Sequence, residues 1–310
     1  PRHRLDLPRV AIYHTWLNTQ DEGWARFTFE QLGLPYTSIH KDDLRAGSLR
    51  RRFDVILVPS TGGASADDLI HEVDSKWSPL PFTATRDFPS HGTPSSTPDM
   101  TGGPGFLGMA ELERFVRDGG VLIALHQGTR LAAETGIARE LSVLSAGSLF
   151  HPGSVVRVKA RRRDHPILYG YPDTTHVLRG NGPLYSVARR DRGMIVLQYG
   201  TEALPDERAD AKPGPMFGIE SPAPAARDTT PTPRPGIYVL SGMVRGQDAI
   251  VGQGAVFDVP VGRGRVVAFT FNPLHRFLNH HEFPMVWNAI MNWNDLTTGQ
   301  GVRPVSAAAP

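Results

Sequence analysis

The chain of 310 residues is long enough for one large α/β domain with insertions, or for two domains. Its charge is balanced, with 33 basic and 31 acidic residues and a formal net charge of +2, which gives no electrostatic footprint for nucleic acid. The absence of cysteine excludes a disulfide framework, a thiolate zinc site and a cysteine nucleophile. The longest aliphatic run, VLIAL, is far too short to span a membrane.

The first sixty residues alternate between short apolar runs and a helical pattern. An amphipathic helix is predicted at Asp21–Gly33, where Trp24, Phe27 and Leu32 are spaced for one face. Strands alternating with helical segments in this way imply a parallel sheet with right-handed crossovers. The three strands predicted here are Arg9–His14, Pro35–His40 and Phe53–Ser60.

Two stretches rich in Gly, Pro, Ser and Thr interrupt the pattern, near residues 61–105 and 202–236. Loops of this length inside a compact domain are usually functional or mobile. Residues 85–100 and 222–235 within them are expected to be exposed and without regular structure. The segment TGGASADD, which follows the third strand, is either an anion cradle of backbone amides or a mobile loop.

The second half of the chain adds further strands to the same body. A helix at Leu107–Gly120 leads into a buried strand at Val121–Leu125, and Val259–Val267 reads as a hairpin around a Gly-containing turn. An amphipathic helix is predicted at Phe283–Trp293. We therefore expect a single domain over residues 1–296, with a mostly parallel sheet, helices on both faces and added antiparallel strands, followed by a flexible tail at 297–310.

Polar side chains follow the predicted parallel strands at their carboxyl ends. In a doubly wound sheet these ends share one edge, where ligands bind near the switch in strand order. His126, in LIALHQGTRL, is the central candidate; it either binds or reacts with a ligand, or hydrogen-bonds a neighbouring loop and caps its turn. The other candidates are His14, Trp16, Ser60, Thr61, Gln127 and Gly128, joined by Asn272 and His275 if the last long strand is parallel.

Two other groups of residues each allow a binding and a structural interpretation. Trp16 and Trp24 have rings that can stack on a ligand, although a Trp on a first helix more often packs in the core. The run His280, His281 and Glu282 offers metal-binding side chains, but adjacent residues rarely face one point, and capping of the last helix is the alternative.

Four segments resemble a known family, and together they cover nearly the whole chain apart from the two insertions. They run from Arg9 to Ser60, from Gly119 to Glu134, from His151 to Pro172 and from Gly262 to Met291; the first, with DEGW and FDVI, is the most specific. They resemble the class I glutamine-amidotransferase-like domain that follows the catalytic domain in many bacterial zinc carboxypeptidase-family proteins. Similar folds occur in trehalose-utilisation-type proteins and in the trimerisation domain of some β-galactosidases.

The resemblance implies a flavodoxin-like three-layer α/β/α sandwich and a parent polypeptide whose peptidase half lies upstream, in a secreted or periplasmic protein. The chain begins at Pro1 rather than Met, so we expect a fragment or a processed product. Zinc is expected only in that peptidase half, because this chain has no H-x-x-E ligand pair. We expect no cofactor, nucleic-acid partner or metal site in this chain itself.

The resemblance also frames the question that His126 poses. In a working glutaminase the strand-tip residue attacks as a thiolate activated by a histidine and an acid. Here a histidine stands at the tip, and the His-Pro-Glu pair usual after the last strand is replaced by NPLH. The sequence therefore predicts a non-catalytic accessory domain. The alternatives are a sugar-related enzyme or binding protein of the trehalose-utilisation type, acting at His126, and an oligomerisation domain.

Overall fold

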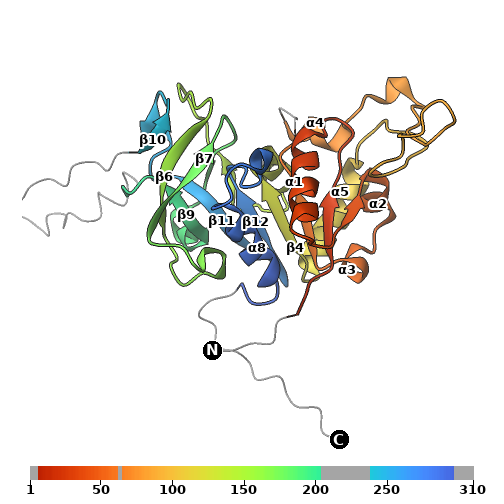
Figure 1. Cartoon of the computed structure of the whole chain (residues 1–310). Coiled ribbons are helices and arrows are strands. Elements are labelled where there is room, and N and C mark those ends of the chain that lie inside the picture. The colour runs from red at the N-terminus through yellow and green to blue at the C-terminus, as the bar shows by residue number, and fades with distance from the viewer. Residues whose placement is uncertain (1–5, 62–64, 204–237, 297–310) are drawn as a thin grey trace, which may run out of the picture.

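The computed structural model describes residues 6–61, 65–203 and 238–296, and its centre is one ten-stranded sheet (Figure 1). Five neighbouring strands are parallel, in the order β12-β4-β3-β1-β2. The predicted neighbours, the strands that begin near residues 9, 53 and 121, are confirmed. The parallel strands are β1 (Val10–Tyr13), β2 (Thr37–Ile39), β3 (Val55–Val58), β4 (Val121–Leu125) and β12 (Gly264–Phe269).

The second half of the chain extends this sheet with antiparallel strands. The predicted hairpin joins β11 to β12, with Val261 opposite Gly264 beside the turn. The order continues β11-β9-β6-β10. Strand β7 lies off this path and also pairs with β6. A separate two-stranded sheet pairs β5 with β8. These strands are β5 (Ser142–Val143), β6 (Ser154–Ala160), β7 (Thr174–Arg179), β8 (Tyr185–Ser186), β9 (Ile195–Tyr199), β10 (Val239–Gly242) and β11 (Gly254–Val261).

Helices cover both faces of the sheet. Alternate residues along β1 and β3 belong to two different cores: Val10 and Ile12 pack with α1 and α8, whereas Ala11 and Tyr13 pack with α2, α4, α5 and α6. This arrangement confirms the flavodoxin-like three-layer α/β/α sandwich with added antiparallel strands. The helices are α1 (Gln20–Gln31), α2 (Lys41–Ala46), α3 (Leu49–Arg52), α4 (Ala66–His71), α5 (Gly105–Arg117), α6 (Thr129–Ala133) and α8 (Phe283–Met291), and single 3-10 turns include η1 (Ser75–Trp77), η2 (His126–Gly128), η3 (Pro166–Leu168), η4 (Arg189–Met194), η5 (Gln247–Ala249) and η6 (His275–Phe277).

The buried face of α1 differs from the predicted one. Ala25 and Phe29 are buried with Glu22, whereas Phe27 and Leu32 remain 38% and 47% exposed. The reason is that Phe29 packs edge-on against Tyr36 and Trp287, which fixes the rotation of the helix. The periodicity identified the helix correctly and its core-facing side wrongly.

The first insertion is folded over the outer strands of the sheet. We call residues 72–104 the cap segment; it lies beside α2 and α5 (Figure 1). Its regular structure consists of the 3-10 turn η1 and two isolated β-bridges, Val73 with Thr101 and Phe82 with Thr97. Residues 85–100 contain turns and no helix or strand, and most are exposed, as predicted. The second insertion from residue 204, the stretch 222–235 and the tail 297–310 lie outside the described residues.

The residue before α8 does not cap the helix, contrary to the interpretation of the HHEF run. The Glu282 side chain makes no capping hydrogen bond; its Oε1 instead accepts a 2.6 Å hydrogen bond from the backbone N–H of Leu178 in β7. His281 Nε2 lies 2.9 Å from the carbonyl oxygen of His176 on the same strand. Both side chains therefore satisfy backbone groups of β7, where the sheet offers no further strand.

Within the described residues, no helix is long and apolar enough to be a membrane span.

Replacing Glu282 with Gln should stabilise the protein, and more so as the pH rises. Burial raises the pKa of Glu282 well above its usual value of 4.5, so the unfolded chain gives up this proton at a lower pH than the folded chain does. The free energy of unfolding of wild type therefore falls as the pH rises from 4.5 towards the pKa of folded Glu282, by up to about 1.4 kcal/mol per pH unit. The variant does not lose this stability, because Gln does not titrate. Urea unfolding at several pH values would measure this difference.

Glu140→Gln is the matched control, because it makes the same chemical change at a partly exposed side chain that has no ion pair within the described part of the chain. Over the range from pH 4.5 to 8, the stability gained by Glu140→Gln should be smaller than the gain from Glu282→Gln. If Glu282→Gln were destabilising by the same amount at both ends of this range, Glu282 would be an ionised partner in the fold instead of a buried acid.

Candidate functional site

The carboxyl ends of the parallel strands lie at one edge of the sheet. Val58 pairs with Ala124, and Phe269 pairs with Leu125, so the residues that follow β3, β4 and β12 start at nearly the same level. The parallel direction of β12 meets the condition on which Asn272 and His275 were expected to join the site. The edge carries the predicted residues His14, Trp16, Ser60, Thr61, His126, Gln127, Gly128, Asn272 and His275.

His126 occupies a strained turn between β4 and α6. It begins η2 with a backbone φ of 48°, in the left-handed region that non-glycine residues seldom adopt. The turn is tight, since a Cβ added at Gly128 would lie 2.3 Å from the carbonyl oxygen of Pro59. This sharp strand-to-helix turn is the geometry that presents a nucleophile in some α/β enzymes. Here it presents an imidazole.

Neighbouring loops enclose the ring of His126 on both sides. Its Nδ1 lies 3.1 Å from the Oγ of Ser60, which is itself buried at the tip of β3. Its Nε2 faces the loop after β7: a Cβ added at Gly182 would lie 2.3 Å from this atom. The buried Nε2 makes no well-aligned hydrogen bond in the described structure. The ring thus joins the tip of β3 to the loop at residues 180–183.

The imidazole of His126 is neutral at physiological pH. Burial lowers its pKa to about 4, and the positive charge of Arg179 lowers it further. His151 has a pKa of about 4 for the same two reasons. The guanidinium of Arg179, in turn, donates to the Tyr199 hydroxyl and to backbone carbonyls of the 180–183 loop. The site is therefore built around one fixed positive charge and two neutral histidines.

Three of the predicted residues line one cavity of about 150 Å³ at this edge: His126, Asn272 and His275. Its other walls are Asp21, Pro152, Leu178 and Gly180, and sequence reasoning named none of these as site residues. In the sequence, Asp21 is marked only as an acidic residue at the start of a helix. Residues 178–182 carry no sequence feature that predicts a site, because the folded sheet alone brings β7 close to His126. Asp21 Oδ1 lies 3.9 Å from His275 Nδ1 at the rim.

The remaining predicted residues do not line this cavity. Gln127 Oε1 instead accepts a hydrogen bond from Arg130 Nε at 3.0 Å, on the first turn of α6. Thr61 is buried beside Ser60. His14 and Trp16 belong to a second cluster at the tip of β1, where their rings meet edge to face with centroids 4.5 Å apart.

The second cluster is buried and held by carboxylates. His14 Nδ1 lies 3.3 Å from Glu22 Oε2, and Arg26 pairs with the same carboxylate. Glu72 accepts from the Tyr13 hydroxyl at 2.6 Å and from the backbone N–H of Trp16 at 2.8 Å. These contacts fix Trp16 in place, so its position is consistent with the predicted packing role.

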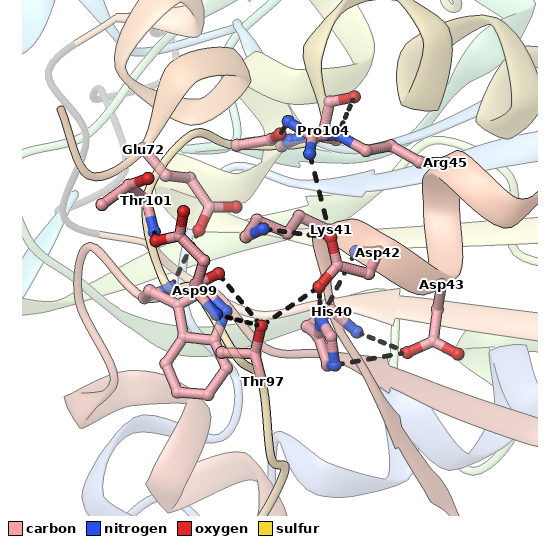
Figure 2. Close-up of polar contacts among 12 residues, drawn as sticks. His40, Lys41, Asp42, Asp43, Arg45, Glu72, Thr97, Asp99, Thr101 and Pro104 are labelled. Carbon is pink, nitrogen blue, oxygen red and sulfur yellow. Dashed lines mark hydrogen bonds and ion pairs between the residues drawn. The ribbon is translucent and has the colours of Figure 1, made fainter. Parts of the chain in front are cut away.

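The cap segment is anchored on Trp16 of this cluster and on Asp42 of α2, and Figure 2 shows the contact between Thr97 and Asp42. Phe82 packs against the Trp16 ring with centroids 5.2 Å apart, and Thr97 Oγ1 donates to Asp42 Oδ2 at 3.2 Å. Lys41, which is 3% exposed, donates to the other oxygen of Asp42 at 3.0 Å. The insertion therefore closes over the tips of β1 and β2 through direct contacts. Of the TGGASADD segment, Ser65 caps α4 in a capping box with Asp68, and residues 62–64 lie outside the described structure.

The described residues contain no group of three or more His, Asp or Glu side chains placed to hold a metal ion.

The chain has a flavodoxin-like fold of the glutamine amidotransferase type. The structure of PurLQS from Thermotoga maritima shares the fold, with a TM-score of 0.51 and 14% identity over 93% of this chain and 100% of that chain. A ThuA-like protein from Bacteroides uniformis matches with 11% identity over 93% of each chain and a TM-score of 0.46. A glutamine amidotransferase from Thermotoga maritima matches with 9% identity over 93% of this chain and 87% of that chain, with a TM-score of 0.38. No protein-family model and no curated protein sequence matches the chain.

Adding a methyl group at Gly182 tests the enclosure of His126. Because the new Cβ would lie 2.3 Å from Nε2, Gly182→Ala should destabilise the fold by about 1–3 kcal/mol through overpacking. His126→Ala should remove most of this penalty, so the double variant should show a coupling energy of at least about 1 kcal/mol in chemical unfolding. Gly193→Ala is the control, since nothing lies within 4 Å of a Cβ there. Additive effects of the two changes would show that the ring does not fill this space.

Proposed function

We propose that this chain is a non-catalytic, amidotransferase-like accessory domain of a zinc carboxypeptidase-family polypeptide. The observation that carries the non-catalytic part is the enclosure of His126. The residue stands where a nucleophile would, yet its ring is wedged between Ser60 and Gly182 and is neutral. The carboxypeptidase context rests on the sequence resemblance of the four segments alone.

The chemistry available to His126 supports the loss of glutaminase activity. A pKa of about 4 makes the imidazole a weak base, which is poorly suited to deprotonating the buried Ser60 hydroxyl near neutral pH. His275, the histidine nearest to the missing His-Pro-Glu position in the sequence, lies 3.9 Å from Asp21 at the rim and lines the same cavity as His126. A nucleophile, a matched base and an orienting acid are not assembled among these residues.

A groove at the opposite edge of the sheet supports contact with another module. It encloses about 470 Å³ between the start of β1, the end of α1 and α8, and its lining is apolar throughout. Leu7, on its wall, is 70% exposed. An apolar concavity of this kind suits packing against a protein surface, such as the peptidase module or a second copy of the chain. The residues that line it are Leu7, Pro8, Val10, Phe29, Leu32, Leu34, Pro35, Trp287, Ile290 and Met291.

A second function is the binding of a small ligand at the His126 edge, as the trehalose-utilisation resemblance suggests. The observation that favours it is the cavity of about 150 Å³, which combines Asp21, Asn272 and two histidines with the apolar side chains of Pro152 and Leu178. Hydroxyl groups of a sugar can both donate to and accept from such a set. This function is compatible with the absence of catalysis.

The purified chain should release neither ammonia from glutamine nor amino acids from short peptides, with or without added zinc. His126→Ala and His126→Cys should behave like wild type, because a thiol at the turn still lacks its base and acid, and losing members of such a unit costs about 10³-fold or more in rate. Coupled ammonia detection and amine-release assays would measure both activities. Turnover that disappears in His126→Ala would make this histidine catalytic and contradict the proposal.

The accessory role is tested separately by the reading frame that contains Pro1. The proposal expects an upstream module with an H-x-x-E ligand pair in the same frame. It also expects that removing residues 6–296 from that polypeptide lowers its Tm clearly, while its kcat/KM changes little. A reading frame that encodes no such module would contradict the accessory role and leave the assays above unaffected.

A further inference from the structure

Arg179 is a buried cation whose contacts are all neutral. The residue is 1% exposed and ends β7. Its guanidinium donates to the Tyr199 hydroxyl at 3.1 Å, to the Gly180 carbonyl at 2.8 Å and to the Gly182 carbonyl at 3.1 Å, and it stacks on the Tyr199 ring. Among the residues that the structure describes, no carboxylate forms an ion pair with it. A guanidinium cannot release its proton in a protein, so this charge is permanent.

A permanent charge without a counter-ion is costly in a protein interior. Hydrogen bonds to neutral carbonyls offset part of the desolvation penalty, which amounts to several kcal/mol per ion, but they leave the net charge in place. The field of such a charge extends well beyond its hydrogen bonds because the surrounding dielectric constant is low. An anion that binds nearby therefore gains more here than it would at the surface.

The cavity beside His126 is a space open to such an anion. Leu178 and Gly180, the two residues that flank Arg179 in sequence, both line it. The carbonyl of Gly182 accepts from Arg179, while the Cα of the same residue faces Nε2 of His126, so the guanidinium and the His126 ring both pack against Gly182. Burial lowers the pKa of His126 and of His151 to about 4, and the positive charge of Arg179 lowers both further.

The cavity also offers hydrogen-bond donors. Asn272 Oδ1 accepts from the backbone N–H of Leu274 at 3.2 Å, which orients the side chain and leaves its NH₂ group to donate. His275 stands at the rim of the cavity as a second polar group. Donors in front of a fixed positive charge form the usual arrangement for holding an oxyanion.

We infer that the cavity lined by His126, Asn272 and His275, with Arg179 behind it, binds a small oxyanion, a carboxylate or a phosphate. The oxyanion accepts from Asn272 and from His275, and its charge is balanced by Arg179 through the wall. Asp21 at the rim repels a second negative charge, so the remainder of a larger ligand would be neutral or cationic at that end. This binding does not depend on the proposed accessory role.

Thermal unfolding of the full chain in sodium acetate, sodium phosphate and sodium chloride at equal ionic strength tests the inference. Acetate or phosphate should raise Tm by roughly 2–4 °C above chloride at concentrations well above its Kd, and the rise should saturate. A rise that continues with concentration would instead indicate general exclusion of salt from the protein surface. Saturation with acetate alone assigns a carboxylate, and saturation with phosphate alone assigns a phosphate.

Asn272→Asp supplies the critical variant, because it keeps the acceptor for Leu274 and places a carboxylate in the cavity. It should abolish the saturable rise. If Asn272→Asp fails to fold, His275→Glu takes its place as the test. It puts a negative charge at the rim without altering the turn at Asn272, and it should weaken binding at least tenfold. The control is Asn294→Asp, the same chemical change at an exposed position on the opposite edge. Equal Tm values in the three salts, or a full saturable rise in both cavity variants, would overturn the inference.

Discussion

The parallel ladder between β4 and β12 decides where the polar residues of this protein meet. Both strands are buried along their whole length, and Arg265 is the one charged residue in them, so their pairing is stabilised from the two cores at once. The ladder runs from Val121 opposite Arg265 to Leu125 opposite Phe269. The chain therefore leaves both strands side by side, and His126 and Asn272 come to line one cavity although they are far apart in sequence. A shift of this register would separate them.

The turn that holds His126 has the sharp strand-to-helix geometry that can present a reactive side chain, but it presents an imidazole. The left-handed φ of His126 and the close approach of Gly128 to Pro59 are features of a turn that presents a side chain for reaction. The side chain presented is a neutral ring, enclosed by Ser60 and Gly182. A positive charge behind it opposes protonation and suits an anion instead. The electrostatics of the edge thus favour holding a ligand over transferring a proton.

The edge is divided into two parts with different roles. Around β1, the carboxylates of Glu22 and Glu72 fix His14 and Trp16, and the cap segment closes over them through Phe82. Around β4 and β12 the cavity remains, with Asp21 and His275 at its rim. The first part is a packed support and the second is the space available to a ligand. The apolar groove at the other end of the sheet is the surface best suited to a protein partner.

The sequence alone determined the strands, the hairpin and the three-layer fold, because buried strands and amphipathic helices leave periodic apolar patterns that need no tertiary information. It also placed nine candidate residues at one edge, since strand ends in a parallel sheet must coincide. Only the tertiary structure separated His126, Asn272 and His275 from His14 and Trp16, or brought Arg179, Asp21 and Gly182 to the same place. The buried side of α1 was predicted wrongly, and so was the capping of α8 by the HHEF run, since Glu282 binds to β7 instead. Each depends on contacts with partners that are remote in sequence, and the local pattern carries no record of such contacts.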